Sequence, residues 1–379
     1  MTSSPATLQS HTRFVAAVPA LTRIAPLVDL VPGLPRRTLL HAGPPFADPL
    51  DLPPPVFNSV AAACRHEGWA GSMDSVRSAL SEGSVRLAAA QDHGVVTPLT
   101  FVVGPSMFAL EVADRETERT RVSPLNDGPL PHALRLGTGA EEGLAILRRL
   151  TDGIGADLAA HLRGPVPVLP VLAKALREGD ELHGRVNAAQ AEVRGFFDAE
   201  LPARAAVYLA QANQFVLNVI MATSAVMMAA GNGVEGSEFV VAAGGNGREM
   251  GWKLAKAPDT WITAPAARPV GGRLPGHEAA QPLPAIGDSA VVDAVGFGAA
   301  CLRFAPELGE TLKRHIDTDF YSEAAHAPFV GPHPALPDGV RVGLDLTRPR
   351  SILGIMLGMV GEQGTEGLIG RGVAPWPAS

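Results

Sequence analysis

The run FVLNVIMATSAVMMAA, residues Phe215–Ala230, carries no charged side chain. Only Asn218, Thr223 and Ser224 interrupt its apolar side chains. A helix that spans a bilayer needs about 20 apolar residues, so an uncharged run of this length is more typical of a buried helix in a globular protein. We therefore expect one long apolar helix, beginning near Ala205, at the centre of the core.

Three carboxamides lie in and just before the uncharged run. Gln211, Gln214 and Asn218 are three and four residues apart, which places them on one helix face. A buried amide must find hydrogen-bond partners or cost free energy. Two interpretations follow: the amides bond neighbouring backbone, or they form a wall of a binding site.

The composition is that of a globular protein with a large core. The chain has 379 residues, of which 46% are hydrophobic and 18% charged, and this length predicts two or three domains. A net charge of −7 without a Lys/Arg cluster argues against nucleic-acid binding. Cys64 and Cys301 lack metal-ligand spacing, so we expect no metal and no cofactor.

The N-terminal residues lack the pattern of a secretory signal. We expect a cytoplasmic enzyme or enzyme subunit that forms homo-oligomers and binds no membrane. The expected organisation is mixed α+β and multidomain, with a lead-in (residues 1–35), an α+β domain (36–130), a mainly helical domain (131–230) and an α+β domain with glycine-rich loops (231–379). Helices are expected over residues 141–162 and 171–197, and short strands on both sides of a turn at residues 104–107.

The helix expected over residues 171–197 changes character midway. Leu172 and Leu176 begin an apolar row that continues with Asp180, His183 and Asn187. Because a neighbouring row stays apolar, this polar trio borders the core. His183 is then either a core histidine held by Asp180 or Asn187, or part of a functional site.

Two further segments suggest anion binding, both weakly. Residues 244–247 (GGNG) follow an expected strand and precede Arg248, and backbone N–H groups of such a turn can hold an anion. Residues 117–121 (TERTR) resemble the phosphate motif of transcarbamoylases, but they lie in a charge run that is more typical of a solvated hairpin tip. Asp288 is expected to cap a helix that reaches about Phe304.

Several short segments together resemble the YlbE-like (AllG) family, which is associated with oxamate carbamoyltransferase of allantoin breakdown. They are RTLLHAGPP, DHGVVTPLTFVVGPSM, the Asn-Asp-Gly at 126–128, ALREGDELHGRVNAA, the Asn of FVLN, WITAPA and IGDSA, spread from about residue 34 to 345. The resemblance implies irregular α+β domains with a small helical one and no complete Rossmann domain. The chain is similar to a divergent member with a short N-terminal part, and residues 212–214 replace an Asn-Asp-His-like run.

The resemblance also implies a reaction. A carbamoyl group would move between carbamoyl phosphate and the amide nitrogen of oxamate or a similar small acceptor. His183 or His93 would polarise the carbonyl group or act as a base. These two histidines and Asp180 are the catalytic candidates, and the expected substrate-binding residues are Asn126, Arg185, Asn187, Asn218, Asn246, Gly247 and Arg248.

Two other functional classes remain open at this point. One is a non-catalytic or regulatory subunit whose partner is an FdrA-like chain that resembles CoA ligases. The other is a lyase or isomerase that acts on a small carboxylic acid with Asp180 and His183. The transferase hypothesis requires the nominated imidazole, amide and guanidinium groups to meet in one cavity beside the uncharged helix.

Overall fold

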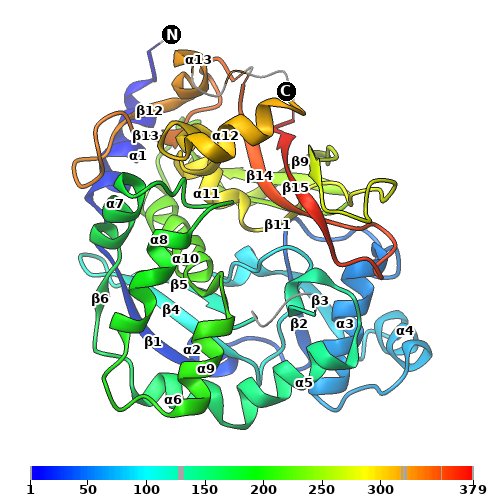
Figure 1. Ribbon diagram of the computed structural model, residues 1–379. Helices are drawn as coiled ribbons and strands as arrows, with labels where there is room; N and C mark the ends of the chain where they lie inside the picture. Colours follow the sequence, from blue (N-terminus) through cyan, green and yellow to red (C-terminus); the bar gives the residue numbers. More distant parts are fainter. Residues whose placement is uncertain (1, 127–131, 317–318, 320–321, 351, 378–379) are drawn as a thin grey trace.

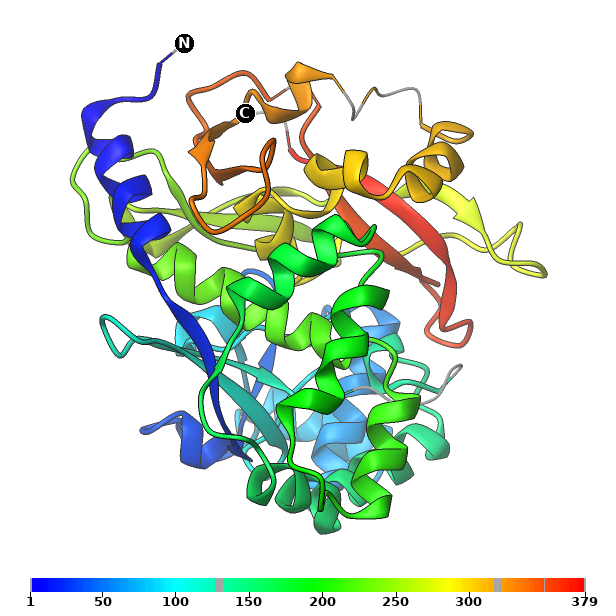
Figure 2. The ribbon, with the colours of Figure 1, turned by 60° about the vertical axis from the view of Figure 1, so that its left-hand side comes forward.

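The computed structural model describes residues 2–126, 132–316, 319, 322–350 and 352–377. The fold is mixed α+β, as predicted, with its strands arranged in several small sheets. Two parts lie on either side of a central helix (Figures 1 and 2). Asp127 and Gly128 of the family-like Asn-Asp-Gly lie outside the described residues.

The first part is built on an antiparallel sheet of order β5-β4-β1-β6. Its strands are β1 (Pro19–Pro26), β4 (Phe108–Asp114), β5 (Thr120–Pro124) and β6 (Val166–Pro167). Beside it, β2 (Thr38–His41) pairs in parallel with β3 (Arg86–Ala89), next to α3 (Pro54–His66) and α4 (Met73–Ser81). The β4–β5 pairing confirms the hairpin tip at residues 114–121.

Residues 2–35, expected only as a lead-in, form a helix and an inner strand of this part. Helix α1 (Pro5–Ala16) packs on the central helix, and β1 is an inner strand of the sheet. Buried Leu21 and Ile24 anchor β1. Two apolar residues are too short a pattern to predict this strand from the sequence. The expected strand before the turn at 104–107 is also absent from the described chain, where Val103 makes only an isolated bridge to Leu40.

Helix α10 (Phe215–Ala230) is the centre of the molecule, as predicted. All its residues are buried, and it packs on β4, β5, β7 (Val240–Asn246) and α11 (Ala290–Val295). It does not continue α9 (Ala203–Gln211), however, because the two axes differ by 77°. No single helix in the described chain has the length and apolar character to cross a bilayer; only this bent pair does when its two parts are counted together.

The two other long helices predicted in this region are interrupted. The first is divided into α5 (Glu141–Arg149), a π-helical turn and α6 (Gly155–Ala160), and the second into α7 (Leu169–Arg177) and α8 (Asn187–Glu192). Gly179 and Leu182 have φ of 101° and 73°, a left-handed backbone that a helix cannot contain. The polar residues between α7 and α8 therefore lie on a loop and not on a helix face.

The second part contains two larger sheets. One has the order β11-β7-β8-β9 and the other β10-β15-β14. Their remaining strands are β8 (Glu249–Leu254), β9 (Ala257–Pro265), β10 (Val270–Arg273), β11 (Ile286–Gly287), β14 (Gly354–Val360) and β15 (Leu368–Pro375). A β12–β13 pair (Phe329–Pro332 and Arg341–Leu344), α12 (Pro306–Lys313) and α13 (Glu323–His326) complete this part.

Asp288 does not cap a helix, so that prediction was wrong. Its buried carboxylate accepts hydrogen bonds from the backbone N–H groups of Gly43 and Thr97, each at 2.9 Å, and from Gln91 Nε2 at 2.6 Å. Burial raises the pKa of Asp288 to about 7. The carboxylate thus ties together three segments that are distant in sequence, while Ser289 precedes α11.

Candidate functional site

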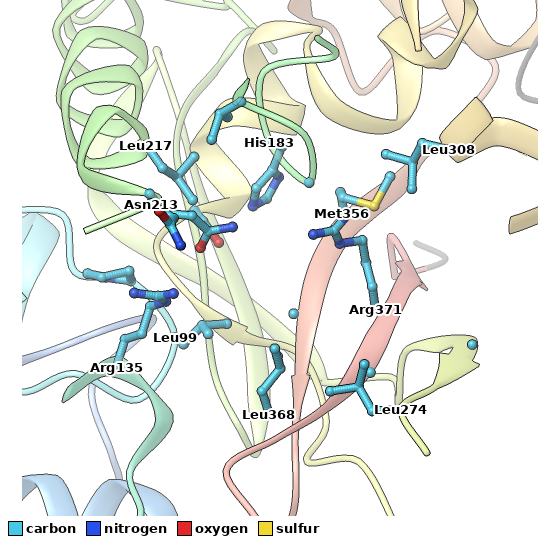
Figure 3. A pocket seen from close by; sticks show the side chains of 18 of the residues that line it. Leu99, Arg135, His183, Asn213, Leu217, Leu274, Leu308, Met356, Leu368 and Arg371 are labelled. Atoms are coloured by element: carbon cyan, nitrogen blue, oxygen red, sulfur yellow. The ribbon is translucent and has the colours of Figure 1, made fainter. Parts of the chain in front are cut away.

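A cavity of about 550 Å³ opens where the two parts of the fold meet. The start of α10, the loop between α7 and α8, and strands β10, β14 and β15 contribute to its wall (Figure 3). Its polar and charged lining residues are Arg135, His183, Asn187, Asn213, Gln214, Arg273, Ser289, Thr311 and Arg371. The volume is in the range of small-molecule sites.

His183 projects into this cavity from the α7–α8 loop (Figure 3). Its Nδ1 lies 2.7 Å from Asp293 Oδ2, so Nε2 is the ring nitrogen left for a ligand. Burial alone would lower the pKa of His183, but the charge and hydrogen bond of Asp293, aided by Glu181, raise it above its ordinary value. The imidazolium form is therefore favoured.

Two buried carboxylates hold the histidine in place. Glu181 accepts the backbone N–H groups of His183 at 2.8 Å and Arg185 at 2.6 Å, and burial raises the pKa of Glu181 to about 7. Asp293 Oδ1 accepts the N–H groups of Ala299 and Met356. Because these bonds fix both carboxylates, the orientation of the imidazole is built into the fold.

Three arginines give the cavity its positive charge. Arg135 comes from the 3₁₀ turn Leu134–Leu136, Arg273 from β10 and Arg371 from β15. Burial lowers the pKa of Arg135 to about 10, which leaves it charged at neutral pH. Among the described lining residues there is no Asp or Glu. Such a cavity favours an anionic ligand.

Two of these arginines, Arg273 and Arg371, form no ion pair within the described residues. The Arg371 guanidinium makes no hydrogen bond or ion pair there. Arg273 Nη1 donates to Met359 Sδ, a weak acceptor, and its buried Nε has no partner in the same part of the chain. Arg371 is exposed and Arg273 is half-buried with an unpartnered Nε, so both guanidinium groups can bond an anion that enters the cavity.

Backbone strain and an unpaired hydroxyl mark the same place. Leu99, which lines the cavity, and Leu182, which precedes His183, have φ of 46° and 73°. Such conformations cost about 1–3 kcal/mol each and gather at functional sites. Ser289 is 2% exposed and lines the cavity, and its hydroxyl has no partner among the described residues.

The structure brings only some of the predicted site residues together. His183 and Asn187 line the cavity, and Arg185 lies in a depression beside it. Asp180 is turned away and accepts the N–H of Ala189 in α8 at 2.9 Å. His93 lies at the end of the turn Ala90–His93, outside the lining.

The other predicted residues bond to one another or to nearby backbone. Asn126 Nδ2 donates to Asn218 Oδ1 at 2.8 Å beneath α10. Asn246 Oδ1 accepts the backbone N–H of Arg248 at 2.9 Å, Gly247 forms the turn, and Arg248 pairs with Asp51 on the surface. None of these five lines the cavity.

Sequence reasoning missed the residues that dominate the site: Arg135, Glu181, Arg273, Asp293 and Arg371. Asp293 had a readable signal, since it is a single acid within the apolar run AVVDAV, where an unpaired charge is costly. The three arginines had no local signal. Within the described ranges, no group of three or more His, Cys, Asp or Glu side chains is placed to hold a metal ion.

The family model described as "Oxamate carbamoyltransferase subunit AllG" matches residues 85–289, which is more than half of the chain. The chain belongs to the AllG family. This confirms the resemblance noted in the sequence. The AllG match includes Arg135, His183 and Arg273, whereas Asp293 and Arg371 lie beyond it.

Three individual proteins are similar to this chain. The oxamate carbamoyltransferase subunit AllG of Escherichia coli K12 is 29% identical, over 71% of this chain and 67% of that protein. The uncharacterized protein YahG of the same organism is 26% identical, over 97% of this chain and 82% of its own length. The crystal structure of a conserved protein of unknown function from Enterococcus faecalis V583 has a TM-score of 0.89 at 23% identity, covering 98% of this chain and 94% of that one. This last similarity shows a shared fold.

Proposed function

We propose that this AllG-family chain is a carbamoyltransferase-like enzyme that moves a carbamoyl group between carbamoyl phosphate and a small amide or amine acceptor such as oxamate. One observation carries the proposal: three guanidinium groups and the His183–Asp293 pair face one cavity. Carbamoyl phosphate carries a phosphate and oxamate a carboxylate. Arginine suits both, because its planar N–H groups match two oxygens of either anion.

The transfer itself needs no covalent link to the protein. The acceptor nitrogen forms a bond to the carbamoyl carbon, the bond from that carbon to the phosphate oxygen breaks, and phosphate leaves with the electron pair. As imidazolium, His183 donates from Nε2 to the carbonyl oxygen, where negative charge develops. As neutral imidazole it accepts the proton that the attacking nitrogen loses. The raised pKa of His183 favours the first role, in which the departing phosphate takes the proton that the attacking nitrogen loses.

The amides at the cavity wall would orient the two substrates. Asn187 begins α8, and Asn213 and Gln214 lie at the break between α9 and α10. Amide groups can bond both the carbamoyl NH₂ and the acceptor amide. Holding two reactants in register contributes much of the rate in a transfer of this kind.

A second candidate function is that of a subunit within an assembly. It is favoured by the names of the family and of the Escherichia coli relative AllG, since both are called a subunit. The partner would be an FdrA-like chain that resembles CoA ligases, and the chain would also pair with copies of itself in the cytoplasm. The position of Asp180, outside the cavity, does not favour the lyase or isomerase alternative.

The test is turnover by the purified chain with carbamoyl phosphate and a panel of amide and amine acceptors that includes oxamate. Phosphate release and the carbamoylated product are measured together. His183→Ala should lower turnover more than about 100-fold, while His93→Ala, outside the cavity, should act like the wild type. Near-wild-type rates in His183→Ala would contradict the proposal.

The same assay distinguishes a catalytic chain from a non-catalytic subunit. Turnover that appears only after an FdrA-like chain is added, and that survives His183→Ala, would favour a non-catalytic role. Turnover that needs the partner but is lost in His183→Ala would place the chemistry in this chain within an assembly.

A further inference from the structure

A shallow outer depression of about 280 Å³ adjoins the cavity. It lies between the α7–α8 loop and helix α12, and Asn187, Thr311 and Arg371 border both spaces. Arg185 and Glu307 line only the outer one. The side chain of Arg371, seen near the cavity mouth in Figure 3, thus stands between the two.

Arg185 is held in this depression by two different carboxylates. Its backbone N–H donates to buried Glu181, which fixes the main chain. Its Nη1 lies 3.0 Å from Glu307 Oε2, and the Glu307 side chain is 84% exposed on α12. Arg185 Nε is buried and has no partner within the described residues. The guanidinium is therefore only partly satisfied, by an acid that is free to move into solvent.

Arg185 and Arg371 act on each other electrostatically. Burial lowers the pKa of Arg371, and the positive charge of Arg185 lowers it further, whereas Glu181 opposes this. Two like charges near one depression repel. An anion with several oxygens placed between them would accept hydrogen bonds from both and would remove the repulsion.

Residues of the α7–α8 loop connect this depression to His183. Gly184 and Arg185 follow His183 directly, and Gly184 lines both spaces. A phosphate held by Arg185 and Arg371 would place a group bonded to one of its oxygens next to the imidazole. The outer position also gives free phosphate a direct way to solvent, while Arg273 on the inner side remains available to a carboxylate.

We infer that the outer depression is a phosphate-binding subsite, in which Arg185 and Arg371 hold the phosphoryl group and Glu307 occupies Arg185 only while the subsite is empty. The inference rests on the proposed function, because it assigns the phosphate of carbamoyl phosphate to a place. It makes one unusual demand: removal of the Glu307 charge must improve phosphate binding, because a competing carboxylate is lost.

The experiment is a calorimetric titration of the full chain with inorganic phosphate. Glu307→Gln should tighten the dissociation constant about two- to fivefold, the range expected for the loss of an exposed ion pair. The matched control is Glu310→Gln on the same helix, which pairs with Lys313 at 2.8 Å and should have no effect. Arg185→Gln should weaken binding roughly tenfold or more, whereas exposed Arg177→Gln should not.

Three results would overturn the inference: a wild-type chain that binds no phosphate, Glu307→Gln with equal or weaker affinity, or Arg185→Gln with wild-type affinity. The titration needs no turnover, so it can fail separately from the proposed function. If the chain transfers carbamoyl groups but its phosphate affinity is the same with and without the Glu307 charge, only the subsite is rejected. If the phosphate affinities change as predicted but no carbamoyl transfer is detected, only the proposed reaction is rejected.

Discussion

Two regions of this molecule place a glycine before an arginine at the end of a strand or hairpin, and they differ in how their polar groups are bonded. In the β7–β8 hairpin, Arg248 pairs with Asp51 at 2.8 Å, and Asn246 bonds the backbone of the turn. On the β10–β15 pair, Arg273 and Arg371 face a cavity and form no ion pair within the described chain. Composition does not separate the two regions. The two regions differ in whether their charged groups are paired, because only an unpaired group can form new hydrogen bonds with a ligand.

The glycines serve the same purpose in both regions. A Cβ on Gly245 would lie 2.2 Å from the carbonyl oxygen of Ala285, and one on Gly370 would lie 2.2 Å from that of Gly272. Each glycine lets neighbouring strands approach closely. A glycine-rich run is therefore evidence for close packing here, and it becomes evidence for anion binding only where a cation beside it is unpaired.

The largest effect is expected from the cavity arginines. The double variant Arg273→Gln and Arg371→Gln should weaken the binding of carbamoyl phosphate and of oxamate roughly 10- to 100-fold, because each ligand loses one arginine and hydrogen bonds to charged groups contribute about 1.5–3 kcal/mol. Its melting temperature should stay near the wild-type value. Binding measured by calorimetry checks the first part and thermal unfolding the second. A change in affinity of less than about threefold would contradict the claim that the unpaired arginines of the cavity bind the anions.

In the hairpin, the glycine should matter for stability and not for affinity. Gly245→Ala should lower the free energy of unfolding by about 1–3 kcal/mol, since its Cβ would overlap the backbone of Ala285. Gly195→Ala is the matched control, because a Cβ at Gly195 meets nothing within 4 Å. Urea unfolding measures both variants. Wild-type stability in Gly245→Ala would show that the backbone around Gly245 can move to make room for the added Cβ.

The pH dependence of stability tests the hairpin region through Asp288, which lies beside β7. Because burial raises its folded-state pKa from 3.8 to about 7, the folded protein keeps a proton that the unfolded chain loses. This contribution to stability is complete below about pH 4 and is lost as the pH rises through 7. The expected slope is roughly 1 kcal/mol per pH unit or less. Asp288→Asn should reduce it in urea unfolding across pH 5–8, and an unchanged slope would contradict the assignment.

The smallest effect is expected at Arg248. Its pair with Asp51 is exposed on both sides, and such pairs contribute about 1 kcal/mol or less. Arg248→Ala should therefore leave both the melting temperature and KM for carbamoyl phosphate close to wild type. A marked rise in KM would return the hairpin to consideration as an anion site.

The elements predicted well are those whose cause is local. The uncharged run Phe215–Ala230 was predicted to be buried helix and is α10, because sixteen consecutive uncharged residues leave few alternatives to burial. Its start was predicted too early, near Ala205, because the spacing does not show the bend after α9. The loop between α7 and α8 was taken for helix, because Leu172, Leu176, Leu182 and Val186 fit a helical period. Positive φ at Gly179 and Leu182 depends on the surrounding fold, which spacing does not reveal.

The site was only partly accessible from sequence for a similar reason. His183, Arg185 and Asn187 were nominated because an apolar row turns polar within a few residues. Arg371 meets the cavity through the pairing of β15 with β10, about a hundred residues earlier in the chain. Contacts of such long range arise from tertiary pairing, and they leave no mark on local periodicity.

The account depends on the claim that the cavity between the two parts of the fold holds the anionic substrates. A crystal structure of the chain with carbamoyl phosphate and oxamate tests this most directly. We predict phosphate oxygens within about 3 Å of Arg371 and the carbamoyl oxygen beside Nε2 of His183. An empty cavity, with the anion instead at the hairpin of Gly247 and Arg248, would contradict it.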